Sequence, residues 1–126
     1  MKVLKIKESA LKFALIASKK LYPREFSGLL RGRENLIEEI LVMPGTIYGK
    51  NFSMQRMDMK PIDSSIIGSV HSHPGRNFYP SNEDLNFFRK FGFIHLILAY
   101  PYESIRNVKA YDKFGNEIKL EIYSLK

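Results

Sequence analysis

The chain has 126 residues, of which 44% are hydrophobic and 13% aromatic, so we expect one folded domain over residues 1–126 and not a disordered protein. It has no cysteine, which excludes disulfides and thiolate metal sites and leaves His, Asp and Glu as metal ligands. Its net charge of +7 suits an acidic protein partner as well as a nucleic acid. No RNA-binding aromatic motif or zinc-finger spacing supports the second, so no nucleic-acid partner is expected.

The apolar runs of the sequence are short. The run FIHLILAY, residues 93–100, is far too short to span a bilayer. The N-terminal stretch MKVLKIKESALK alternates lysine with apolar residues and lacks the core of a signal peptide. We therefore expect a cytoplasmic protein with no membrane partner.

The hydrophobic pattern of the first third predicts a strand, a helix and two further strands. A short strand is expected over residues 3–7, and apolar residues recur at helical spacing over residues 9–21. Pro23 ends that helix. The runs EFSGLLRG and LIEEILVMP then predict two strands around a turn at residues 32–35.

The rest of the chain predicts more strands and a second helix. Residues 44–64 are polar and punctuated by glycine, which predicts a mobile loop with a strand near residues 52–59. A buried strand, SSIIGSVHSHP, ends at Pro74, and a helix over residues 82–91 and a strand at FIHLILAYP follow. The last segments predict a hairpin that turns at Gly115–Asn116. Because there is no strict βαβ repeat, we expect an α/β (α+β) domain with a mixed sheet and packed helices.

The stretch HSHPGRNFYPSNED holds two of the three histidines and points to a metal site. Alternate residues of a strand face the same side, so His71 and His73 can converge on one point. Asp84, on the first turn of the next helix, can supply a third and anionic ligand. Three protein ligands and a water are the arrangement of catalytic zinc sites, so the pattern predicts bound Zn²⁺.

The same stretch has a second interpretation. SNED is close to a helix capping box, with Ser81 as N-cap and Asp84 at the third helical position, where the helix dipole favours its charge. A His-x-His pair at a strand end is also more often exposed or hydrogen-bonded than metal-bound. The combination within fourteen residues favours the metal site, and Ser81 can cap the helix while its hydroxyl faces the metal.

Hydrolysis at such a site also requires a base that takes a proton from water. Glu25, between a helix end and a strand start, is the strongest candidate. Glu38 and Glu39 are alternatives that composition does not separate from it. His95 lies inside an apolar run, and we expect a core histidine there and not a ligand.

Taken together, PREFSGLL, GSVHSHP and SNED resemble the JAMM (MPN-type) zinc metalloprotease family. Its signature is a glutamate followed by x-x-G-L-L, then far downstream H-[S/T]-H-P, then a serine separated from the second histidine by seven residues, and then x-x-D. Residues 25–30, 71–74 and 81–84 match these three elements, and the seven residues are PGRNFYP. No motif residue is missing, which argues against the inactive members of the family that have lost their metal ligands.

The resemblance implies a fold, a ligand set and a mechanism. The fold is MPN or cytidine-deaminase-like, with a mixed sheet flanked by helices, and His71, His73 and Asp84 bind Zn²⁺. Glu25 takes the proton of the attacking water and later protonates the leaving amine. Ser81 donates a hydrogen bond to the oxyanion of the tetrahedral intermediate.

The resemblance also implies a substrate, because the family typically cleaves isopeptide bonds between the C-terminus of ubiquitin or a ubiquitin-like protein and a lysine. A short chain without cysteine is most similar to free-standing archaeal members that act on small ubiquitin-like modifiers (SAMPs), which implies a desampylase. Segment 44–64 falls where the family has an insertion that pairs with the substrate's C-terminal tail. We expect substrate contacts by strand addition, or else an ordinary strand with a methionine-rich core face, at Phe52, Ser53, Met54, Gln55, Arg56 and Met57.

Other functions fit the sequence less well. A cupin places a glutamate a few residues after its second histidine, whereas the next acid here is Glu83, and 126 residues are too few for an amidohydrolase barrel. A scaffold or modifier-binding module that keeps a structural zinc is expected to lack Glu25 or Ser81, and both are present. A nucleic-acid-binding domain would show steep salt dependence. A homodimer is compatible with the sequence, which leaves the oligomeric state and the true modifier open.

Overall fold

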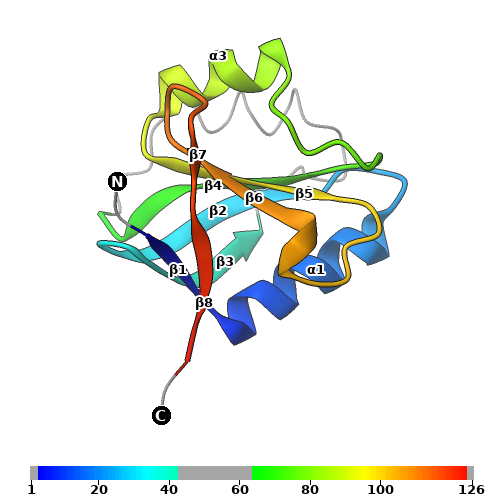
Figure 1. Cartoon of the computed structure of the whole chain (residues 1–126), viewed down its shortest axis with the longest axis horizontal. Coiled ribbons are helices and arrows are strands. Elements are labelled where there is room, and N and C mark those ends of the chain that lie inside the picture. The colour runs from blue at the N-terminus through cyan, green and yellow to red at the C-terminus, as the bar shows by residue number, and fades with distance from the viewer. Residues whose placement is uncertain (1–2, 43–63, 125–126) are drawn as a thin grey trace.

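The computed structural model describes residues 3–42 and 64–124, in which eight strands form one mixed sheet with an α-helix on each face (Figure 1). The strand order is β7-β6-β5-β4-β2-β3-β1-β8. The elements are β1 (Leu4–Lys7), α1 (Glu8–Leu21), β2 (Ser27–Arg33), β3 (Leu36–Val42), β4 (Ile66–His73), α3 (Asn82–Phe91), β5 (Ile94–Ala99), the 3₁₀ turn η2 (Ile105–Asn107), β6 (Val108–Tyr111), β7 (Glu117–Ile118) and β8 (Leu120–Tyr123). The predicted mixed sheet flanked by helices is confirmed. The strand expected near residues 52–59 lies outside the described residues.

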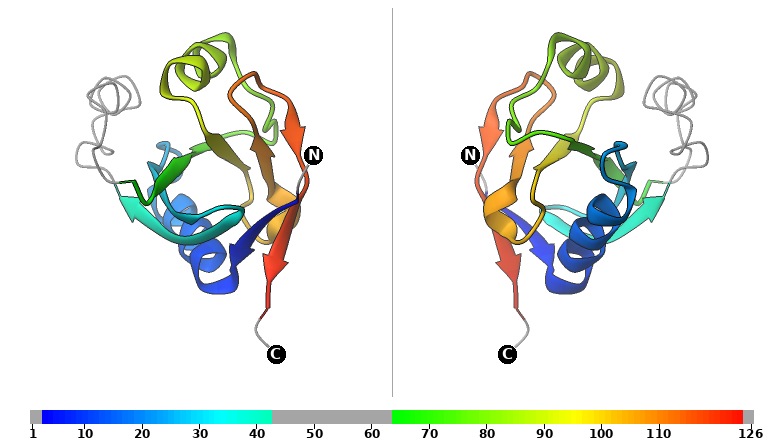
Figure 2. Two further views of the ribbon diagram at one scale, coloured as in Figure 1. Left: turned by 90° about the vertical axis from the view of Figure 1, so that its left-hand side faces the viewer. Right: turned by 90° about the vertical axis from the view of Figure 1, so that its right-hand side faces the viewer.

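The end of the chain differs in part from the prediction. β6 and β7 form the expected antiparallel hairpin, and Gly115 supplies its positive φ of 86°. β8 does not extend this hairpin, because it pairs in parallel with β1 at the other edge of the sheet. Only Lys119 separates β7 from β8, so the sheet curls until its two edges meet (Figure 2). The local pattern of a hairpin strand does not reveal this change of partner.

α1 covers one face of the sheet because its apolar side chains recur on one side of the helix. Its buried Ser18 hydroxyl donates to the carbonyl of Ala14 at 2.8 Å, so this polar group is satisfied. The helix ends at Leu21, before Pro23 as predicted. The core of this layer consists of Leu4, Ile6, Ala10, Leu11, Ala14, Leu15, Phe26, Leu30, Ile37, Val70, Leu96, Leu98, Tyr102, Val108, Ala110 and Ile118.

α3 covers the opposite face. Ser81 caps its N-terminus and Gly92, with φ 79°, ends it. The smaller core beneath it consists of Leu29, Ile66, Phe87, Phe88, Phe91, Ile97 and Tyr111. Neither α-helix in the described part of the chain is long and apolar enough to cross a membrane.

β4 lies in the middle of the sheet, parallel to β5 and antiparallel to β2. Gly68 allows the close approach of β5, since a Cβ at this position would stand 1.9 Å from the carbonyl oxygen of Ile94. Val70 belongs to the core under α1. Because side chains alternate along a strand, His71 and His73 therefore face the side of the sheet that α3 covers.

Candidate metal centre

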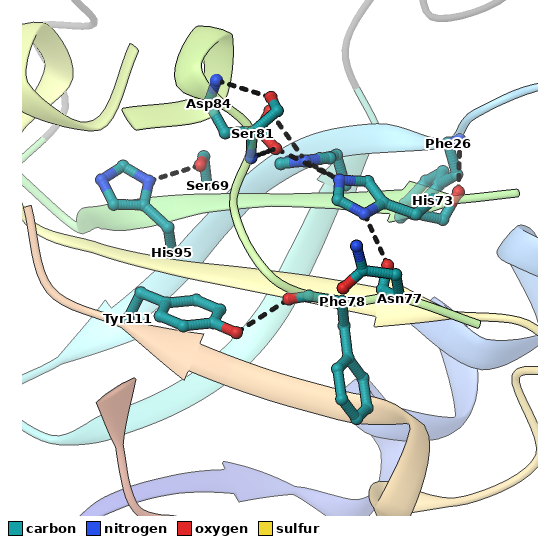
Figure 3. Close-up of polar contacts among 11 residues, drawn as sticks. Phe26, Ser69, His73, Asn77, Phe78, Ser81, Asp84, His95 and Tyr111 are labelled. Carbon is teal, nitrogen blue, oxygen red and sulfur yellow. Dashed lines mark hydrogen bonds and ion pairs between the residues drawn. The ribbon is translucent and has the colours of Figure 1, made fainter. Parts of the chain in front are cut away.

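Three side chains from β4 and α3 meet at the carboxyl end of β4 (Figure 3). The Nε2 atom of His71 lies 3.2 Å from Asp84 Oδ1, and the Nε2 atom of His73 lies 3.2 Å from Asp84 Oδ2. The two Nε2 atoms are 3.3 Å apart. One ligand atom from each residue can be chosen so that all lie within 4.8 Å of one another. The structure thus brings together the three residues that the sequence predicted as ligands.

The capping box is also present, and it aims the carboxylate. The Asp84 N–H donates to Ser81 Oγ, and the Ser81 N–H donates to Asp84 Oδ2, each at 3.0 Å. Asp84 is 0% exposed, and the same carboxylate contacts both imidazoles. The capping box is therefore compatible with a metal-binding role of Asp84, because the cap fixes the rotation of the side chain that faces the histidines.

A main-chain carbonyl fixes the orientation of His73. Its Nδ1 lies 2.8 Å from the carbonyl oxygen of Asn77 (Figure 3). Since a carbonyl only accepts, Nδ1 carries the proton and donates, which leaves the lone pair of a neutral imidazole on Nε2. Metal-binding histidines in proteins are commonly held in this way through their other ring nitrogen.

Charge complementarity joins the three side chains. Burial by itself raises the pKa of Asp84, but hydrogen bonds from His71 and His73 outweigh it and hold the pKa well below its usual range. Burial lowers the pKa of His73, whereas its hydrogen bonds to Asp84 and the Asn77 carbonyl outweigh this effect and raise the pKa above the usual 6.5. The contacts therefore favour the ionised form of Asp84 and shift His73 toward its protonated form.

Glu25 lies beside this site because its neighbour is bound to β4. The Phe26 N–H donates to Ser72 Oγ at 2.8 Å, and the Ser72 N–H donates to the Phe26 carbonyl at 2.9 Å. Ser72 stands between the two histidines, so these bonds tie the residue after Glu25 to the histidine-bearing strand. Glu25 is half-buried, and its negative charge raises the pKa of His73. This effect is smaller than those of burial and hydrogen bonding.

The two alternative bases lie elsewhere. Glu38 and Glu39 belong to β3, which β2 separates from β4. Glu38 Oε2 lies 3.8 Å from Lys7 Nζ, and Glu39 Oε1 lies 3.2 Å from Arg31 Nη1. Glu25 is thus the carboxylate of the three that the fold ties to the histidine strand.

His95 is a core histidine, as predicted. It is 0% exposed, its ring stacks on Phe88 with centroids 4.1 Å apart, and its Nδ1 lies 2.6 Å from Ser69 Oγ. Burial lowers the pKa of His95 to about 3, so the ring is neutral at physiological pH. It does not belong to the metal-binding group.

Three groups that hold the ligand-bearing segments in place were not predicted from the sequence. Ser72 carries a signal, because the family pattern prefers Ser or Thr at that position, but its bond to Phe26 could not be foreseen. Tyr102, from the segment after β5, donates its hydroxyl proton to the His73 main-chain carbonyl. Asn77 acts through its carbonyl, which every residue type has, so no letter marks it. The substrate-binding residues predicted over 52–57 lie outside the described residues.

The family model described as prokaryotic homologs of the JAB domain matches residues 8–112. The chain belongs to this family. A probable metalloprotease from Haloferax volcanii is 35% identical over 130 residues, which cover 95% of this chain and 80% of that protein. The family assignment made from the sequence motifs is confirmed.

Solved structures agree with this assignment. A JAB1/MPN domain protein from Archaeoglobus fulgidus is 35% identical, with a TM-score of 0.76 over 96% of this chain and 100% of that one. A structure described as JAMM, a metalloprotease-like zinc site in the proteasome and signalosome, is 32% identical, with a TM-score of 0.76 over 98% and 100%. His71, His73 and Asp84 thus form a JAMM/MPN metalloprotease-like site, and two imidazoles with a carboxylate are a donor set that suits zinc.

We expect the affinity of the site for zinc to decrease as the pH is lowered from neutrality. Zinc requires a neutral imidazole, whereas the metal-free site raises the pKa of His73 above 6.5. Below that pKa the apparent affinity should fall about tenfold per pH unit, because one proton must leave. Protonation of His73 has the opposite effect on folding stability. Because the pKa is raised in the folded chain, protonation stabilises the fold fully below pH 6.5, and this contribution is lost as the pH rises through the raised pKa. Zinc titrations against a competing chelator between pH 5.5 and 8 measure this, and a pH-independent affinity would contradict it.

Proposed function

We propose that the protein is a zinc-dependent isopeptidase that cleaves the bond between the C-terminus of a ubiquitin-like modifier and a lysine. The observation that carries the proposal is the convergence of His71, His73 and Asp84, with Glu25 tied to the same strand. Two neutral imidazoles and one carboxylate leave a position for water, which is the pattern of catalytic zinc sites. Membership of the JAB family and a relative that is a probable metalloprotease support it.

The residues of the chain divide the chemistry between them. Zinc held by His71, His73 and Asp84 would act as a Lewis acid and lower the pKa of a water to about 7. Glu25 accepts the proton of the attacking water and delivers a proton to the leaving lysine amine. The Ser81 hydroxyl accepts from the Asp84 N–H. Its own O–H therefore remains a donor, which can bond to the oxyanion as the carbonyl becomes tetrahedral.

The proposed substrate follows from the family motifs. Its partners would be ubiquitin-like modifiers and their conjugates, with SAMP-type modifiers as the first choice and desampylation as the reaction. Residues 52–57, which lie outside the described residues, are the proposed contact for the extended C-terminal tail of the modifier. A cytoplasmic location is part of the same proposal.

The test uses the full chain and a modifier joined to a lysine of a second protein. We expect the zinc-loaded protein to release the modifier with an intact C-terminus and an unmodified lysine, both identified by mass spectrometry. Removal of zinc with a chelator should abolish release, and added zinc should restore it. A zinc-loaded, folded protein that binds the conjugate and leaves it intact would contradict the proposal and establish the non-catalytic MPN-type modifier-binding module instead.

A further inference from the structure

The loop between β4 and α3, residues 74–81, is contacted by two side chains of β6. This loop supplies the Asn77 carbonyl that accepts the Nδ1 proton of His73. The next carbonyl, that of Phe78, accepts a hydrogen bond of 2.8 Å from the Tyr111 hydroxyl (Figure 3). The Lys109 ammonium lies 5.0 Å from the centre of the Phe78 ring. Two residues on one face of β6 therefore contact both the ring and the carbonyl of Phe78.

Tyr111 is suited to a fixed contact. It is 2% exposed and its ring lies near that of Phe88, with centroids 6.3 Å apart, in the core beneath α3. Burial raises the pKa of Tyr111 to about 12, so the hydroxyl stays protonated and remains a donor at physiological pH. Because this hydroxyl is buried and donates to one acceptor, it restricts the Phe78 carbonyl more than an exposed and mobile hydroxyl would.

The geometry joins this contact to the metal ligand. The carbonyls of Asn77 and Phe78 belong to planar peptide groups that share the Phe78 Cα. Because β6 contacts both the carbonyl and the ring of Phe78, rotation about the N–Cα bond of Phe78 is the main freedom left between that residue and the Asn77 carbonyl. The Asn77 carbonyl in turn places the proton of His73 on Nδ1 and directs Nε2 toward Asp84. We propose that Tyr111 is a positioning residue of the metal site, which holds the loop so that Asn77 orients His73 for zinc.

The decisive variant is Tyr111→Phe, which removes one hydroxyl and keeps the buried ring. We expect its zinc dissociation constant to rise about tenfold, the lower range for loss of groups that orient a metal ligand. Replacing zinc with Co²⁺ gives a second readout, since the visible bands of the ion should shift if His73 turns. Both measurements are independent of any cleavage activity.

Val108→Ala is the matched control. Val108 lies on the same strand, is buried on the opposite face and belongs to the core under α1. The substitution should lower the thermal stability, while the zinc dissociation constant stays within about twofold of that of the unmodified protein. If Tyr111→Phe binds zinc as tightly as the unmodified chain, or if Val108→Ala weakens zinc equally, the proposal is wrong and Tyr111 only stabilises the fold.

A measurement on the unmodified protein decides the case if Tyr111→Phe does not fold. Coupling between two sites is reciprocal. If the hydrogen bond between Tyr111 and Phe78 increases the affinity for zinc, bound zinc must stabilise that hydrogen bond by the same factor. Exchange of the Tyr111 hydroxyl proton with water, followed by NMR, should be about tenfold slower with zinc than without it. Equal exchange rates would overturn the proposal.

This inference requires the site to bind zinc but does not depend on which bond the enzyme cleaves. The unmodified chain separates the two failures. If that chain takes up no zinc, the proposed function is wrong as well. If it binds zinc and Tyr111→Phe binds zinc equally, the function stands and the role of Tyr111 does not.

Discussion

Replacing Glu25 with Gln is expected to lower kcat about a thousandfold while the protein keeps its zinc, because general acid–base catalysis contributes roughly 10²–10⁴ in rate. Gln has the shape of Glu but does not accept a proton from water. The position of residue 25 depends on main-chain bonds between Phe26 and Ser72, which the change leaves in place. Steady-state cleavage of a modifier–lysine conjugate, with the zinc content of the same sample, measures both parts.

Glu39→Gln provides the control for this experiment. Glu39 is exposed on β3, where it pairs with Arg31 at 3.2 Å, and it was an alternative base on sequence grounds. Its loss should leave kcat within about twofold, because an exposed ion pair contributes little. Normal cleavage by Glu25→Gln would show that another group takes the proton, and a large loss in Glu39→Gln would direct the search to β3.

Replacing Asp84 with Asn is expected to raise the zinc dissociation constant at least about a hundredfold, since the site loses its anionic ligand. The amide oxygen of Asn can still accept the Ser81 N–H, so α3 should keep most of its cap. Circular dichroism should therefore show an unchanged helix content, while a competition titration with a chelator shows the loss of zinc.

Glu83→Gln is the matched change for Asp84→Asn. Glu83 precedes Asp84 on the first turn of α3 but is exposed and lies outside the metal-binding group. This variant tests whether the loss of any negative charge at this helix end lowers the affinity for zinc. Equal losses in both variants would point to a general electrostatic effect, and undiminished zinc in Asp84→Asn would leave the capping box as the whole role of that residue.

The elements that carry the site could be predicted because their signals are local. The helical spacing before Pro23, the alternation that puts His71 and His73 on one side of a strand, and the Ser81 cap depend on residues close together in the chain. For Asp84, the sequence is compatible with a ligand and with a helix cap. In the structure Oδ2 accepts the Ser81 N–H and also contacts His73, so the capping bond does not turn the carboxylate away from the histidines.

The remaining features depend on contacts between distant segments. β8 has the pattern of a hairpin strand, but β1 is the strand with which it pairs. Orientation of His73 by the Asn77 carbonyl leaves no signature, because every residue type has a carbonyl. Tyr111 reaches Phe78 from 33 positions along the chain, and a tyrosine at the end of a short strand does not indicate which carbonyl it binds.

The most direct test of the metal centre is the zinc content of the purified chain, measured by mass spectrometry after loosely held ions are removed. The convergence of His71, His73 and Asp84 predicts about one zinc per chain. A chain that retains no zinc, and takes up none when zinc is added at neutral pH, would contradict the account. HSHPGRNFYPSNED would then be a strand end followed by a capped helix.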